Sequence, residues 1–119
     1  MNQATEVNLY PDTLYYSKCI SESGHQPVYK KILPDGKPQK LSPKPSQKLI
    51  NHSPDGFQWG YNGSGPAQLA LALLYDATND SNIAKTHYQD FKWEVVACWC
   101  DEWEITRQEI LGWLRILAE

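Results

Sequence analysis

A glycine-rich turn at residues 62–65, Asn-Gly-Ser-Gly, carries the residue types in this 119-residue chain best suited to binding chemistry. It lies between an aromatic stretch at residues 57–61, expected as a short strand, and a helix expected over residues 66–77, with Ser64 or Gly65 as its N-cap. Backbone N–H groups at the start of a helix lack partners within the helix, and the helix dipole is positive there. The turn therefore suits an anion, and a nucleotide-like or other phosphate-bearing ligand is the first hypothesis.

Side chains near the turn could complete such a site. Trp59 and Tyr61 offer flat rings to a base, and Asn62 offers an amide. Arg107 could reach a phosphate if the last helix packs near the turn. The expected ligand-binding residues are therefore Trp59, Tyr61, Asn62, Gly63, Ser64, Gly65 and Arg107. The alternative is that the glycines serve only the backbone conformation of a tight turn.

Patterns typical of enzymes and metal sites are missing from the sequence. A P-loop ends in Gly-Lys-Ser/Thr, and Pro66 and Ala67 stand at those places here. Cys98 and Cys100 have no second cysteine pair, and Cys98 is expected to be buried at the end of a helix. The three histidines form no recognisable arrangement with a nucleophile. No catalytic residue, metal or cofactor is predicted, and the protein is expected not to be an enzyme.

The net charge of −3 conceals an asymmetry between the two halves of the chain. Residues 1–54 hold seven lysines against four acids, whereas residues 55–119 hold four basic residues against ten acids. The segment 30–48 alone has six lysines and one acid, so it could follow a nucleic-acid backbone. It has no arginine for bidentate recognition of guanine, and the acidic half would repel DNA. Nucleic acid is therefore the alternative partner rather than the leading one.

The chain is expected to be cytoplasmic. It has no apolar run long enough to cross a membrane, and its first residues do not form a signal pattern. Its three cysteines, at positions 19, 98 and 100, are an odd number and are expected to be reduced thiols.

The predicted fold class is α+β in a single domain over residues 1–119, with a small antiparallel sheet from the N-terminal half packed with three C-terminal helices. Its expected parts are a loose arm (1–12), strands and a proline- and lysine-rich wrap (13–61), and a helical half (64–119). Strands are expected over residues 14–20 and 27–33 around a turn at 21–26, with a shorter hairpin through residues 40–41. Four prolines between residues 37 and 55 argue against a helix there, with Leu49 and Ile50 as apolar anchors.

Two further helices follow the one after the glycine turn. Apolar spacings of three and four residues predict a helix over residues 82–99, with a core-facing stripe of Ala84, Tyr88, Phe91, Val95 and Trp99. Residues 100–103 are expected to be a link. Thr106 and Glu109 fit a capping box at the start of the last helix, and Gly112 is expected to allow close packing. The apolar face of that helix is predicted to be Ile110, Trp113, Leu114 and Leu117.

The stretch GFQWGYNGSGPAQLALALL, residues 56–74, resembles the hallmark of a family of small proteins of unknown function found in phages, prophages and plasmids. The likeness continues at residues 88–97 and 103–114 and so covers about half of the chain. The resemblance implies a fold and a mobile-element setting, and it implies no activity.

The aromatic content points to binding. A small core needs fewer large rings than this chain has, so some of the following are expected to be partly exposed: Trp59, Tyr61, Trp93, Trp103 and Trp113. Exposed Trp and Tyr mark interfaces. The sequence therefore predicts a small non-enzymatic binding protein of a phage or mobile element that sequesters a host protein or a phosphate-bearing ligand. Counter-defence is a role that the resemblance suggests, and homo-oligomerisation is left open. The alternative is a nucleic-acid accessory protein that uses residues 30–48.

Overall fold

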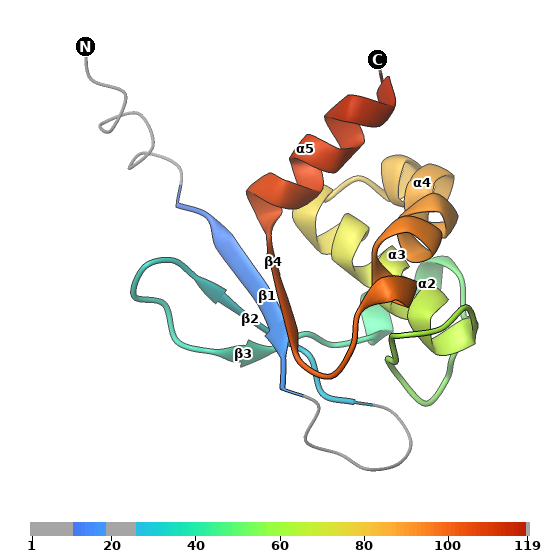
Figure 1. Cartoon of the computed structure of the whole chain (residues 1–119), viewed down its shortest axis with the longest axis horizontal. Helices are drawn as coiled ribbons and strands as arrows, with labels where there is room; N and C mark the ends of the chain where they lie inside the picture. Colours follow the sequence, from blue (N-terminus) through green and yellow to red (C-terminus); the bar gives the residue numbers. More distant parts are fainter. Residues whose placement is uncertain (1–10, 19–25, 119) are drawn as a thin grey trace.

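The computed structural model describes residues 11–18 and 26–118, and it confirms an α+β fold (Figure 1). A four-stranded antiparallel sheet has the order β3-β2-β1-β4. The elements are β1 (Thr13–Ser17), β2 (Tyr29–Ile32), β3 (Gln39–Lys40), α2 (Lys44–Leu49), α3 (Ser64–Thr78), α4 (Ser81–Glu94), the 3-10 turn η1 (Val96–Cys98), β4 (Trp103–Thr106) and α5 (Arg107–Ala118). The expected arm through residue 10, most of the turn at 21–26 and Cys19 lie outside the described residues.

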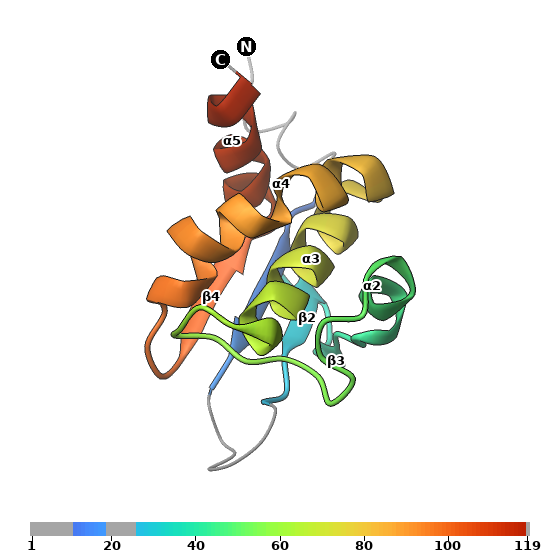
Figure 2. The ribbon, with the colours of Figure 1, turned by 90° about the vertical axis from the view of Figure 1, so that its right-hand side faces the viewer.

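Helix α3 is the centre of the core. Every residue from Gly65 to Leu74 is buried, as its lack of a polar face predicts. The strands lie on one side of α3, and α4 packs along it on the side away from the sheet (Figure 2). No helix in the described part of the chain is long and apolar enough to span a membrane.

The start of α3 differs from the prediction. The N-cap is Gly63, so Ser64 and Gly65 already lie in the first helical turn. Residues 57–61 do not form a strand. The carbonyl of Phe57 accepts from Gln26 N, whereas the N–H of Gly60 donates to Val96 O on the opposite flank. Because these bonds join two separate neighbours, the aromatic stretch crosses the molecule as a connector and joins no sheet.

Strand β4 comes from the C-terminal half of the chain. The sequence suggested only a link before residue 104, but residues 103–106 pair with β1 along its free edge. Trp103 and Ile105 face the helices, and Glu104 and Thr106 face away. A four-residue alternation between a link and a helix is too short to predict a strand without its partner.

The proline-rich segment contains a helix that its composition argued against. Pro43 is the N-cap of α2 and Pro45 lies in its first turn, where a missing N–H costs nothing. Leu49 and Ile50 pack against the core as expected. The prediction failed because proline breaks a helix interior but not a helix start.

A buried amide, Gln68 of α3, holds α2 and the following loop in place. Its Nε2 donates to Ser46 Oγ at 2.9 Å and to Ile50 O at 3.1 Å. Its Oε1 accepts from the backbone N–H groups of His52 at 2.7 Å and Ser53 at 2.9 Å. Gln68 thereby uses its full hydrogen-bonding capacity within the core.

Helix α4 ends at Glu94 rather than at Trp99. Val95 leaves the helical region at φ −123° and ψ −66°, and a 3-10 turn follows. Ala84, Tyr88 and Phe91 of the predicted stripe are buried, while Val95 and Trp99 are only partly buried against the core. Cys98, expected to be buried, is exposed because it lies on this turn.

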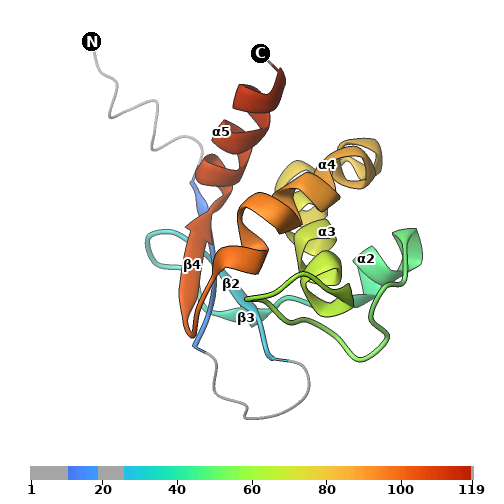
Figure 3. The ribbon, with the colours of Figure 1, turned by 45° about the vertical axis from the view of Figure 1, so that its right-hand side comes forward.

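Helix α5 begins as predicted and ends away from the core. The capping box is formed by Thr106 N donating to Glu109 Oε1 at 2.9 Å and Glu109 N donating to Thr106 Oγ1 at 3.1 Å. Ile110 is buried, but Leu117, predicted for the apolar face, is 39% exposed and Ile116 is 71% exposed. Figure 3 shows the last turns of α5 extending beyond the other helices.

Candidate functional site

The glycine turn is filled largely by the protein itself. A Cβ atom on Gly65 would lie 2.6 Å from Gln58 Cβ and 3.2 Å from Gln58 N, so Gly65 allows two backbone segments to meet. The ring of Tyr61 covers Gly63, because a Cβ there would lie 2.5 Å from Tyr61 Cε2. Asn62 and Ser64 are exposed. The space beside the two glycines is therefore occupied by this chain.

Trp59 does not offer a surface to a base. It is 7% exposed, and its Nε1 donates to Asp101 O at 2.9 Å. Its ring meets Trp103 edge-on, with centroids 5.6 Å apart. Trp59 therefore joins the segment before α3 to the segment before β4. The prediction that it contacts a ligand was wrong, because its ring packs in the core.

Arg107 lies at the wrong end of α3 for the predicted site. Its Nε donates to the carbonyl of Ala77 at 2.7 Å, at the C-terminal end of this 15-residue helix. A helix of this length spans about 22 Å, so the guanidinium is far from the glycine turn. There it complements the negative end of the helix dipole. Of the seven expected residues, the structure leaves Tyr61, Asn62, Gly63 and Ser64 together at the surface.

Glycine-to-alanine changes at two helical positions should have opposite signs. Gly65→Ala is expected to destabilise the protein by about 1–3 kcal/mol, because the new methyl group overpacks against Gln58. Gly112→Ala is the matched control, since nothing lies within 4 Å of its Cβ position, which also contradicts the close packing expected there. It should stabilise α5 by up to about 1 kcal/mol. Urea denaturation midpoints measure both, and two shifts of the same sign would contradict this account.

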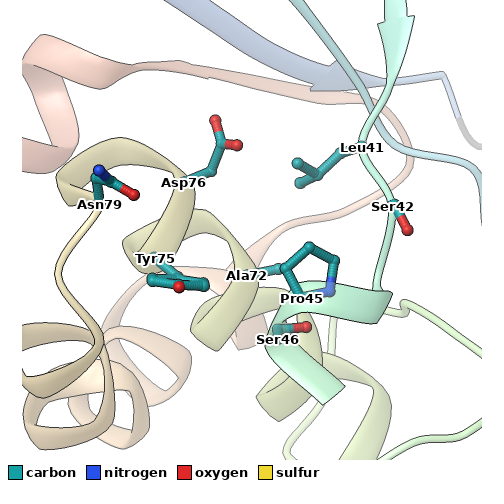
Figure 4. A pocket seen from close by; sticks show the side chains of 8 residues that line it. All are labelled: Leu41, Ser42, Pro45, Ser46, Ala72, Tyr75, Asp76 and Asn79. Carbon is teal, nitrogen blue, oxygen red and sulfur yellow. The ribbon is translucent and has the colours of Figure 1, made fainter. Parts of the chain in front are cut away.

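A pocket of about 320 Å³ lies between α2 and α3 (Figure 4). Asp76 alone is charged among the described residues that line it, and both of its carboxylate oxygens are occupied. Oδ2 accepts from the hydroxyl of Tyr15 and Oδ1 from Lys30 Nζ, each at 2.7 Å. Burial, and then the hydrogen bond to Asp76, raise the pKa of Tyr15 far above its ordinary value, so Tyr15 stays a donor. This cluster ties the sheet to α3 and engages both oxygens of the one carboxylate that lines the pocket.

Two exposed aromatic residues and one half-buried one lie on segments that meet where α4 ends. Trp93 is 59% exposed and Tyr61 is 50% exposed, and Trp99 is half-buried. Gly60 N donates to Val96 O at 3.1 Å, which places the loop of Tyr61 against the turn between Trp93 and Trp99. We call Tyr61, Trp93 and Trp99 the aromatic edge.

The aromatic edge is rigidly supported and has an acidic rim. Trp99 stacks on buried Trp103 with centroids 4.0 Å apart and an interplanar angle of 11°. Lys92 Nζ lies 5.5 Å from the ring centroid of Trp93. Exposed acids follow in sequence on both sides: Asp90, Glu94, Asp101 and Glu102. Sequence reasoning counted Trp93 among the surplus aromatics but assigned Trp99 to the core, because helical periodicity was continued past the true end of α4.

Metal-binding side chains do not converge in the described ranges 11–18 and 26–118. No group of three or more His, Cys, Asp or Glu residues there could hold a metal ion. Cys98 and Cys100 are free, exposed thiols.

Comparison with known proteins gives one match. The model of a family described as a family of unknown function, DUF6166, matches residues 23–116. No curated protein and no solved structure matches the chain. The matched range contains both the glycine turn and the aromatic edge.

Proposed function

Because the chain belongs to DUF6166, a family of unknown function that supplies no activity to transfer, we propose a function from the surface of the molecule. It is a small non-enzymatic binding protein of a phage or other mobile element, and it sequesters a protein of the host cytoplasm through the aromatic edge. The observation that carries this proposal is the exposure of Trp93 and Tyr61 around one junction.

The chemistry of the aromatic edge suits a protein partner. Trp and Tyr are the side chains most enriched among residues that dominate binding energy, and a surface already held in place loses little entropy on binding. Trp99 is held by its stack on Trp103. The acidic residues around the edge favour a partner with an apolar centre and a basic rim.

A phosphate-bearing ligand at the glycine turn has less support. Gly65 and Trp59 serve packing within the chain, and Arg107 binds the far end of α3. The remaining candidate contacts are an exposed amide, a hydroxyl and the first N–H groups of α3. Calorimetric titration with mono-, di- and cyclic nucleotides tests this second candidate directly.

Counter-defence follows from the mobile-element setting alone. The resemblance of residues 56–74 to a family found in phages, prophages and plasmids supports that setting. A small binding protein acts most simply by occupying the surface of its target.

Removing the Trp93 ring should strongly reduce capture of the partner. The affinity-tagged full chain is expressed in its host, and recovered proteins are quantified by mass spectrometry. Trp93→Ser and Tyr61→Ser are each expected to lower recovery of the partner about tenfold or more, because truncating a central aromatic costs about 2 kcal/mol or more. Ile116→Ser, at an exposed position on α5, is the matched control and should leave recovery unchanged.

Two further measurements separate the alternatives. Native mass spectrometry shows whether the captured partner is a second copy of this chain, which would make the aromatic edge a homo-oligomer interface. Washing at high salt should retain an aromatic interface, whereas a complex held by phosphate contacts dissociates. Equal recovery of the partner by the parent and by Trp93→Ser contradicts the proposal.

A further inference from the structure

One face of the sheet has no covering element among the described residues. All the helices lie on the other face, with the strands behind them in Figure 2. The burial of β1 alternates accordingly: Thr13, Tyr15 and Ser17 are buried, and Leu14 and Tyr16 are partly exposed. We call the face that carries Leu14 and Tyr16 the open face.

Strand register shows which side chains share the open face. One row crosses the sheet as Lys40, Tyr29, Tyr16 and Glu104, on β3, β2, β1 and β4 respectively. The neighbouring row is Lys31, Leu14 and Thr106. Two tyrosines therefore occupy the centre, two lysines lie toward the β3 edge, and one glutamate lies on β4.

The central aromatics form a shallow platform. The rings of Tyr16 and Tyr29 stack with centroids 5.8 Å apart and an interplanar angle of 28°. Lys31 Nζ lies 5.7 Å from the centroid of Tyr16. Both rings are only partly buried, so each keeps surface available on the solvent side.

We propose that the open face binds single-stranded nucleic acid. Bases stack on Tyr16 and Tyr29, and the phosphates run past Lys31 and Lys40. Aromatic rings on a sheet combined with nearby cations are the means by which proteins hold single strands without reading their sequence. The described segment 26–48 contains no arginine, so recognition of guanine by a bidentate side chain is not expected there.

The distribution of charge in three dimensions favours this proposal more than the chain totals do. Lys37 precedes β3 and Lys40 lies on it, and both are exposed, whereas Lys30 is bonded to Asp76 on the helical side. Helix α4, in which two lysines balance two acids, packs on α3, away from the sheet. The charges of α4 are therefore separated from the open face by α3 and by the sheet itself.

This inference is independent of the aromatic edge. Trp93 lies on α4 and Tyr61 on the loop before α3, whereas Tyr16 and Tyr29 lie on strands beyond the core. Variants of one surface should leave the other intact. Loss of nucleic-acid binding and loss of partner capture can thus be measured separately.

Fluorescence anisotropy with labelled 12-nucleotide poly-dT and poly-rU tests the proposal on the full chain. The parent should bind both at 50 mM salt, and more weakly at 200 mM. Tyr16→Thr and Tyr29→Thr, which replace the ring by another residue that favours strands, should each weaken binding about fivefold or more. Trp93→Ser is the matched aromatic control and should bind as the parent does. A thermal melt of each variant confirms that it is folded.

Variants that change charge distinguish a direct role in binding from a role in folding, because the expected affinity falls for the lysine variants and rises for the glutamate variant. Affinity falls as salt rises, and Lys31→Gln and Lys40→Gln should each reduce the magnitude of the slope of log affinity against log salt by about 0.7. Glu104→Gln should strengthen binding at 50 mM salt, because it removes a carboxylate from the row that contains both tyrosines. Absence of binding by the parent at 50 mM salt, equal binding of a duplex, or a weaker Glu104→Gln complex overturns the proposal.

Discussion

Leu71→Asp is expected to unfold the protein at room temperature. Leu71 is completely buried in the middle of α3, a helix that has the sheet on one side and α4 on the other. Removing the leucine costs about 2–5 kcal/mol, and the new carboxylate has no partner in the core and adds several more. The two losses together are comparable to the whole free energy of unfolding of a typical domain, about 5–15 kcal/mol. Loss of the cooperative thermal transition in circular dichroism measures the effect.

The control separates burial from the introduction of charge. Ile116→Asp places the same carboxylate on an apolar helical residue that is 71% exposed. It should change the free energy of unfolding by no more than about 0.5 kcal/mol. A Leu71→Asp variant that melts within a degree or two of the parent would contradict the central position of α3.

Gln68→Leu is expected to have the second largest effect, about 3 kcal/mol or more. The burial of the side chain is nearly kept, but three groups lose the partner that Gln68 gives them: the N–H groups of His52 and Ser53 and the carbonyl of Ile50. The hydroxyl of Ser46 loses one bond and keeps its bond to Pro43 O at 2.8 Å. Each buried polar group left without a partner costs about 1–3 kcal/mol. Urea denaturation measures the total loss.

The damage from Gln68→Leu should also be local. Hydrogen exchange should rise in α2 and in the loop through residue 53 more than in α4, because the lost bonds all belong to that segment. Gln108→Leu, at an exposed glutamine on α5, is the matched control and should stay within about 0.5 kcal/mol of the parent. Uniform exchange across the chain would show that Gln68 does not act as a local anchor.

Features that depend on neighbouring residues were predictable from the sequence. The apolar run at residues 65–74 determined a buried helix, whatever it packs against. Thr106 and Glu109 determined the start of α5, because both bonds of the capping box close within three residues. The antiparallel pairing of β1 with β2 followed from two strand-forming segments joined by a turn.

Features that depend on distant residues were not predictable. Residues 103–106 became a strand because β1 offered an unpaired edge, about ninety residues earlier in the chain. The end of α4 and the 3-10 turn are coupled to the bond between Gly60 and Val96. Hydrogen bonds from Gln68 hold α2 in place. The sequence shows a glutamine within an apolar helix, but it does not show which four groups that glutamine binds.

The candidate sites divide in the same way. The sequence by itself determined that a glycine turn precedes a buried helix and that the chain has more aromatic rings than its core needs. Only the tertiary structure decided that Trp59 faces the core, that Arg107 reaches the far end of α3, and that Tyr16 and Tyr29 share an open face. The physical reason is that exposure is a property of packing: a ring contributes to the core or to a surface according to which segments meet it, and those segments lie far away in the sequence.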